Sequence, residues 1–186
     1  MSEPLTDPGP STPDDADWTW VLTRPCPDCG FDPGSLDPAS DPAAVPALLR
    51  DAGERYAAAL GRDDVRARPA EGVWSPLEYT CHVRDVCDVM RGRLEQILDG
   101  NGEVVTFANW DQDATAVERQ YWRSDPEVVQ REVTEAFDAA ATAYARPSGT
   151  QWEWPALRSN GSEFTARTLS LYFLHDIRHH LWDVKA

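Results

Sequence analysis

Four long segments of this chain repeat their apolar residues with the spacing of an α-helix, and this spacing limits the fold more than any other feature. In residues 41–61 the apolar positions recur every three or four residues until a glycine ends the pattern. The same period predicts further helices over residues 75–99, over 124–146, and from about 162–165 to the end of the sequence. No segment of useful length alternates apolar and polar residues, so we expect at most a brief extended piece within residues 152–161. Four long helices predict an all-α fold, a four-helix bundle.

The second helix has the clearest start signal. Ser75 is followed directly by Pro76 and, three residues after the serine, by Glu78. This is a capping box with proline at the first helical position, an arrangement that satisfies two unpaired backbone N–H groups. We therefore expect this helix to begin at Pro76.

Charge and composition exclude several classes of partner. The chain has 186 residues, with 17 basic and 32 acidic side chains and a net charge of −15. Binding to nucleic acid or to an anionic membrane surface needs clustered lysine and arginine, so we expect neither. No stretch approaches the ~20 consecutive apolar residues of a membrane span, and residues 1–17 lack the pattern of a secretory signal. The sequence favours a cytoplasmic protein with small-molecule partners.

The chain divides into three parts. Residues 1–17 are rich in proline and aspartate, so we expect an acidic, disordered N-terminal tail. Residues 18–40 bring tryptophans and a Cys-x-x-Cys pair, and we expect an irregular segment packed on the domain. Residues 41–186 carry the helical pattern and form the bundle.

Placement of the histidines suggests a metal site. His82 lies on the inward face of the second predicted helix. His175 and His179 are four residues apart on the last helix, so their imidazoles lie side by side. Two imidazoles from one helix and one from a facing helix can hold a divalent metal in a bundle. The opposing interpretation is that these are core histidines without a metal. His180 is rotated by about 100° from His179, and we expect it to serve in packing or at the surface.

Two carboxylates could orient these imidazoles. Glu78 lies one turn before His82, although it also belongs to the capping box, and Asp183 lies one turn after His179. A carboxylate in such a position can fix the ring of a metal-ligating histidine.

The segment Cys26-Pro-Asp-Cys29-Gly30 resembles one knuckle of a zinc ribbon. A ribbon needs a second pair of ligands, and the chain has no second Cys-x-x-Cys. Three interpretations stay open: a packed turn without a ligand, a second metal site, and a redox pair. A second copy of the chain could also complete the site, which would make the protein a homodimer.

Two motifs resemble those of a known family. The segment from Trp74 to Asp85 is similar to the W-[ST]-x-x-E-x-x-x-H-x-x-D signature of the DinB/YfiT-like superfamily, and residues 174–184 are similar to its closing H-D-x-x-H-H element. With the segment over residues 158–165, which is similar to the approach to the last helix in actinobacterial members, the resemblance spans residues 41–186. It implies a four-helix bundle with an up-down-down-up course and a divalent metal on three histidines, matching His82, His175 and His179.

The resemblance also implies a reaction. The superfamily includes mycothiol-dependent maleylpyruvate isomerase and S-transferases that use bacillithiol or mycothiol. We therefore expect an enzyme that transfers a low-molecular-weight thiol, with mycothiol as co-substrate, to a small electrophile at a Zn, Ni or Fe ion. Two alternatives remain: a non-catalytic bundle with a structural metal or none, and a dimeric binding module that uses the Cys26–Cys29 segment.

Overall fold

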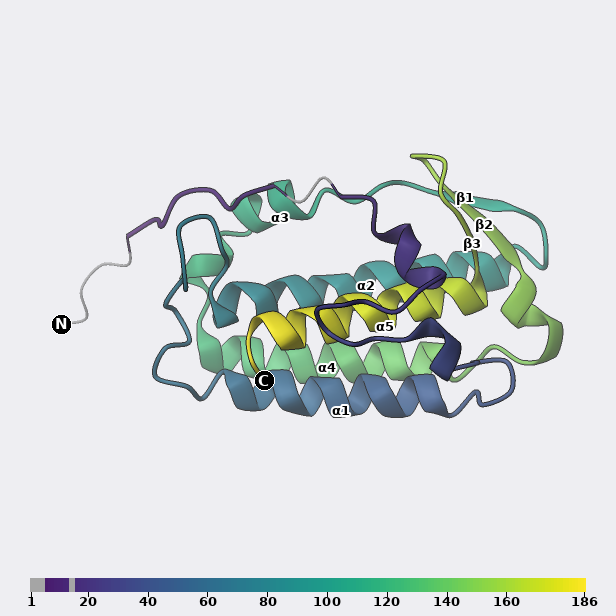
Figure 1. Ribbon diagram of the computed structural model, residues 1–186, viewed down its shortest axis with the longest axis horizontal. Coiled ribbons are helices and arrows are strands. Elements are labelled where there is room, and N and C mark those ends of the chain that lie inside the picture. The colour runs from purple at the N-terminus through teal and green to yellow at the C-terminus, as the bar shows by residue number, and fades with distance from the viewer. Residues whose placement is uncertain (1–5, 14–15) are drawn as a thin grey trace.

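The computed structural model describes residues 6–13 and 16–186, and in this part of the chain four long helices and one short helix are present (Figure 1). Three strands and four short 3₁₀ helices accompany them. The α-helices are α1 (Ala44–Ala59), α2 (Pro76–Asp99), α3 (Gln112–Glu118), α4 (Pro126–Tyr144) and α5 (Ala166–Asp183). The 3₁₀ helices are η1 (Trp18–Leu22), η2 (Pro33–Ser35), η3 (Tyr121–Arg123) and η4 (Gly149–Glu153).

The four long helices follow an up-down-down-up course. Figure 1 shows α2 and α4 running in the same direction, with α1 and α5 running in the opposite direction. Two parallel neighbours need a connection that returns along the bundle, and residues 100–125, which include α3, supply it. α4 packs against both α1 and α2, while α5 packs against α1, α2 and η1.

A small sheet makes the fold mostly helical rather than strictly all-α. β1 (Val105–Phe107) pairs in parallel with β2 (Pro155–Arg158), which pairs in antiparallel with β3 (Glu163–Thr165). The brief extended piece expected within residues 152–161 is β2. Strands of three and four residues are too short to give a clear period of two in a sequence, which is why the pattern predicted no sheet.

Buried tyrosines link the helices to one another. The hydroxyl of Tyr56 on α1 donates to the carbonyl of Ile177 on α5 at 2.7 Å, and that of Tyr144 on α4 donates to the carbonyl of Met90 on α2 at 3.1 Å. Both tyrosines are fully buried, so each ring fills the core while its hydroxyl is satisfied. These bonds fix how far each helix can slide along its neighbour.

Helix caps follow the sequence closely. The Ser75–Glu78 capping box is present, and α2 begins at Pro76 as predicted. Thr165 caps α5 and Asp125 caps α4. The long connection is held to α2 by Asp85, whose carboxylate accepts from the Tyr121 hydroxyl at 2.5 Å.

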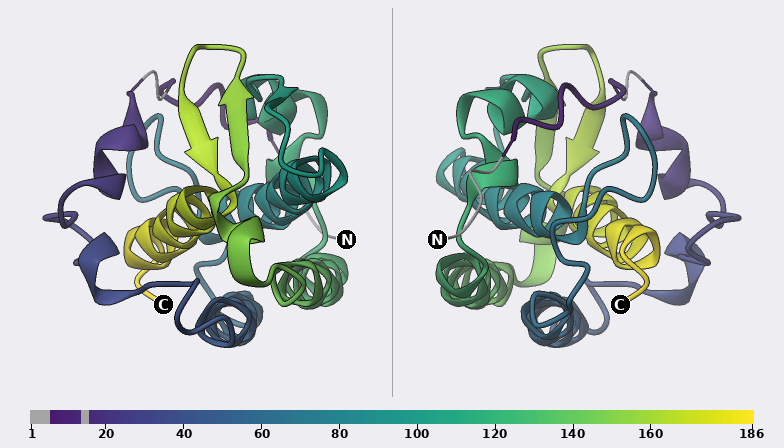
Figure 2. Two further views of the ribbon diagram at one scale, coloured as in Figure 1. Left: turned by 90° about the vertical axis from the view of Figure 1, so that its right-hand side faces the viewer. Right: turned by 90° about the vertical axis from the view of Figure 1, so that its left-hand side faces the viewer.

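The N-terminal segment lies along the outer side of α5 (Figure 2). Residues 18–40 are irregular apart from η1 and η2, and the buried side chains of Cys26 and Phe31 join them to the core of the bundle. Of the expected disordered tail, residues 1–5 and 14–15 lie outside the described residues. Within the described part, Thr12 donates its backbone N–H to the carbonyl of Gly72 at 2.9 Å, and Ser11 bonds to Asp113 at 3.2 Å. None of the described helices is long and apolar enough to cross a membrane.

Substitution of Gly53 tests the close approach of α1 to α4. A Cβ atom at Gly53 would lie 2.8 Å from the Cβ of Phe137, closer than real Cβ contacts allow. We expect Gly53→Ala to lower the free energy of unfolding by about 1–3 kcal/mol, because one helix must shift. Urea denaturation measures this change.

Gly92 on α2 is the matched control. Apart from the backbone of the same helix turn, a Cβ atom there would meet no described atom within 4 Å. Gly92→Ala should raise the free energy of unfolding by about 0.5–1 kcal/mol, since alanine is the better helix former. Equal stabilisation by both substitutions would contradict the packing of α1 on α4.

Candidate metal centre

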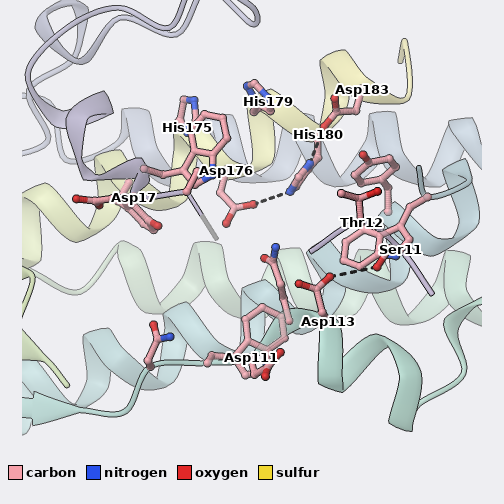
Figure 3. Close-up of a pocket in the computed structure, with 18 of the residues that line it drawn as sticks. Ser11, Thr12, Asp17, Asp111, Asp113, His175, Asp176, His179, His180 and Asp183 are labelled. Carbon is pink, nitrogen blue, oxygen red and sulfur yellow. Dashed lines mark hydrogen bonds and ion pairs between the residues drawn. The ribbon is translucent and has the colours of Figure 1, made fainter. Parts of the chain in front are cut away.

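A pocket of about 570 Å³ opens between α5 and the segments that cover it (Figure 3). Residues 11–12 and 16–18 of the N-terminal segment and residues 109–113 of the long connection form its walls, together with Trp74 and Tyr79. On α5 it reaches His175, Asp176, His179, His180 and Asp183. The chemistry-bearing part of α5 is therefore open to a small molecule.

Three side chains meet beside this pocket in a first candidate metal group. His82 comes from α2, and Asp176 and His180 are four residues apart on α5, so they share one face of that helix. The Nε2 atom of His180 lies 3.2 Å from Oδ1 of Asp176, and the Nε2 atom of His82 lies 3.7 Å from the same oxygen. The ligand atoms of this group all lie within 4.8 Å of one another.

His82 provides a test of whether the group fits a metal. Its side chain is fully buried, and neither ring nitrogen has a hydrogen-bond partner among the described residues. Leaving buried polar atoms unpaired costs about 1–3 kcal/mol each, so an imidazole in this state needs a ligand. Two imidazoles and one carboxylate suit a divalent transition metal and leave coordination positions open. The residues present therefore fit a metal ion.

Asp183 orients His180. Its carboxylate lies 2.8 Å from Nδ1 of His180, which turns Nε2 of the same ring towards Asp176 (Figure 3). Burial by itself lowers the pKa of His180, but the hydrogen bonds to Asp176 and Asp183 outweigh it and raise this pKa to about 9. Without a metal, His180 thus carries a proton that balances Asp176, and a bound ion would take its place.

Burial acts in opposite directions on the pKa values of the other two groups of the centre, His82 and Asp176. Burial lowers the pKa of His82 and keeps this imidazole neutral, as a metal ligand must be. Burial raises the pKa of Asp176, but its interactions with His180 and His82 outweigh burial and hold this pKa well below its ordinary value. Two tryptophan rings lie against His82. The ring of Trp110 stacks on the imidazole with centroids 5.5 Å apart, and the centroid of the Trp74 ring lies 5.1 Å from that of His82.

A second candidate group lies on the neighbouring face of α5. Cys26, Cys29, His175 and His179 offer ligand atoms that also lie within 4.8 Å of one another. The Sγ atom of Cys26 is 3.6 Å from Nδ1 of His179. His175 and His179 therefore lie with the two cysteines, whereas His82 lies with Asp176 and His180.

This arrangement differs from the three-histidine set expected from the sequence. The spacing of four residues does place His175 beside His179, with ring centroids 5.2 Å apart, and His82 does face inward. His180, however, was expected in a packing or surface role, and it stands instead in the group with His82. Positions 176 and 180 have the same spacing as positions 175 and 179, so the sequence contained the signal but could not show which pair faces α2.

The two carboxylates considered as partners of imidazoles contact different groups. Asp183 bonds to His180 rather than to His179. Glu78 makes no hydrogen bond to an imidazole within the described chain. Its carboxylate accepts from Arg68 at 2.5 and 2.9 Å and from the backbone N–H of Ser75 at 2.9 Å, so it serves the capping box.

Comparisons with known proteins identify the family and agree with the fold. Residues 47–184 match the DinB superfamily, and the chain belongs to that superfamily. Among solved structures it is similar to YfiT from Bacillus subtilis, described as a probable metal-dependent hydrolase with an unusual four-helix bundle topology. The two share 14% sequence identity with a TM-score of 0.66, over 77% of this chain and 83% of YfiT, so the likeness shows the fold. No curated protein matches the chain.

Removal of the Asp183 carboxylate tests its role at His180. We expect Asp183→Ala to weaken Zn²⁺ binding about 10–100-fold, because His180 loses the bond that fixes its ring. Titration with Zn²⁺ in a Cys26→Ser, Cys29→Ser background measures the first group alone.

Glu78→Gln is the control for this measurement. It should leave Zn²⁺ affinity unchanged while lowering the free energy of unfolding by about 1–3 kcal/mol, since a buried charged hydrogen bond is weakened. Equal loss of affinity in both variants would contradict the assignment of Asp183.

Proposed function

We propose that this protein is a metal-dependent enzyme that transfers a low-molecular-weight thiol to a small electrophile, with its ion held by His82, Asp176 and His180. One observation carries the proposal: a fully buried imidazole, whose two nitrogens make no hydrogen bond to any described residue, lies opposite an aspartate–histidine pair at a pocket. Membership of the DinB superfamily supports it, because the resemblance of the motifs implies a divalent metal in this bundle.

An open divalent ion would lower the pKa of a bound thiol or water, so that a nucleophile forms at neutral pH. Neighbouring side chains would orient the ligands of this ion and keep water away from them. Asp183 fixes the ring of His180, and Trp74 and Trp110 shield His82 from water. The ligand set of two neutral imidazoles and one carboxylate leaves one positive charge on a divalent ion to stabilise a thiolate.

The lining of the pocket favours a neutral thiol rich in hydroxyl groups. Asp17, Asp111 and Asp113 bring carboxylates to its walls, and several tryptophan and tyrosine rings lie among them. Carboxylates accept hydrogen bonds from hydroxyl groups, and aromatic faces pack against sugar rings.

The one guanidinium of the lining within the described residues is already engaged. Arg158 donates to Asn160 at 2.9 Å and to Ser162 at 3.0 Å. An anionic thiol would therefore meet mostly negative charge in this pocket. Mycothiol, whose sugar and inositol rings carry hydroxyl groups and no carboxylate, fits better, and its partner would be a small electrophile.

Cobalt substitution tests the thiol site. In the Cys26→Ser, Cys29→Ser background, Co²⁺ in the first group has no cysteine ligand, so a thiolate-to-cobalt absorption band must come from an added thiol. We expect mycothiol to produce this band with tighter binding than glutathione, because glutathione carries net negative charge. His82→Ala and His180→Ala should abolish the band, and His175→Ala should keep it.

The outcome separates the proposal from its alternatives. A cobalt protein that binds neither thiol would overturn thiol transfer. If that same protein hydrolysed an ester or an amide, it would be identified as a hydrolase. If no added ligand could bind to the cobalt ion, the ion would be identified as structural. A transfer assay with mycothiol and 1-chloro-2,4-dinitrobenzene, compared between wild type and His82→Ala, completes the test.

A further inference from the structure

We propose that Cys26, Cys29, His175 and His179 form a second metal site, a closed four-ligand zinc site that fastens the N-terminal segment to α5. This site is separate from the His82–Asp176–His180 group and does not depend on the proposed function. A Cys-x-x-Cys motif needs a second pair of ligands to hold zinc, and α5 supplies that pair within the same chain.

The cysteine loop has the shape of a metal knuckle. The backbone N–H of Cys26 donates to the carbonyl of Phe31 at 2.8 Å, and the N–H of Gly30 donates to the carbonyl of Cys26 at 3.0 Å. Gly30 adopts φ +68°, which favours glycine. These contacts close a tight turn that directs both sulfur atoms to one side.

The helix supplies two imidazoles at a matching distance. In a tetrahedral zinc site, bonds of about 2.0–2.3 Å place neighbouring ligand atoms about 3.3–3.8 Å apart. The Cys26 Sγ to His179 Nδ1 distance of 3.6 Å already falls in this range. All four ligand atoms lie within 4.8 Å of one another, so the widest gap needs to close by about 1 Å.

Burial gives an independent reason to expect a ligand. The side chains of Cys26 and His175 are 2% and 3% exposed. The Nε2 atom of His175 is buried and has no hydrogen-bond partner in the described part of the chain. Both thiols are free, so no disulfide satisfies them. A metal ion would satisfy the imidazole and both sulfur atoms together.

Aromatic rings enclose the site. Measured between ring centroids, Trp18 lies 5.5 Å from His175 and 5.0 Å from His179. The centroid of the Phe31 ring lies 5.7 Å from that of His175. Two cysteines and two histidines complete the four-coordinate shell that zinc adopts in structural sites, which leaves no position for a substrate. We therefore assign this site to structure and the first group to chemistry.

The ion would add a further attachment between the N-terminal segment and α5. Arg178 on α5 donates to the carbonyl of Cys29 at 3.1 Å, and the buried side chains of Cys26 and Phe31 pack in the core of the bundle. Trp18 belongs both to the aromatic cover of this site and to the wall of the pocket. The second site thus fixes one wall of the first.

Metal counting on the purified full chain tests the proposal. With Zn²⁺ supplied, mass spectrometry should find about two ions per chain in the wild type. It should find about one ion per chain in each of three single variants: Cys26→Ser, Cys29→Ser and His82→Ala. Cys87→Ser, which changes a buried cysteine outside the group, is the matched control and should keep both ions.

Cobalt spectra give a readout for this site alone. Wild-type protein loaded with Co²⁺ should show thiolate-to-cobalt bands and strong tetrahedral bands without any added thiol, and His82→Ala should keep them. Cys29→Ser should lose them. Cys29 is only half-buried, so this variant serves if Cys26→Ser fails to fold.

Two results would overturn the proposal. One is a wild-type cobalt spectrum without thiolate bands. The other is a Cys26–Cys29 disulfide in protein purified under air, together with failure of the reduced protein to bind Zn²⁺ at these cysteines. That result would identify a redox pair. Hydrogen exchange adds a positional check, since chelation should speed exchange in residues 18–36 and leave α4 unchanged.

Discussion

The whole arrangement depends on α5 being packed on more than one side. α2 and α1 cover part of its surface, the sheet lies at its N-terminal end, and η1 with the cysteine loop covers the outer flank. Consecutive residues on a helix point about 100° apart, so the pairs 175/179 and 176/180 serve different neighbours. One short run of α5 can therefore contribute to two separate groups of ligands, one facing α2 and one facing the N-terminal segment.

Charge and burial give these two groups different characters. The His82–Asp176–His180 group includes a carboxylate, borders an acidic pocket and leaves coordination positions open, which suits chemistry on a small molecule. The cysteine–histidine group is covered by aromatic rings and offers four ligands, which suits structure. The link between them is physical contact, since Trp18 lies against His175 and His179 and lines the pocket as well.

Most of the bundle could be predicted from the sequence because its signals are local. The capping box at Ser75, the apolar period of the four long helices and the inward position of His82 each depend on residues within a few positions of one another. The sheet could not be predicted, because its strands are only three and four residues long and β1 pairs with β2 across about fifty residues of chain. The contacts of Asp183 with His180 and of His180 with Asp176 could not be predicted for a similar reason: a helix pattern does not show which neighbour covers which face.

The sequence by itself determined the helices, the DinB resemblance and several candidate metal ligands, namely His82, His175, His179 and the Cys26–Cys29 pair, but it did not single out Asp176 or His180. Only the tertiary structure decided how these residues are grouped. Ligand sets depend on distances of a few ångströms between α2, α5 and the N-terminal segment. Those distances follow from how Tyr56, Tyr144 and the rest of the core set the helices against one another, which no local spacing encodes.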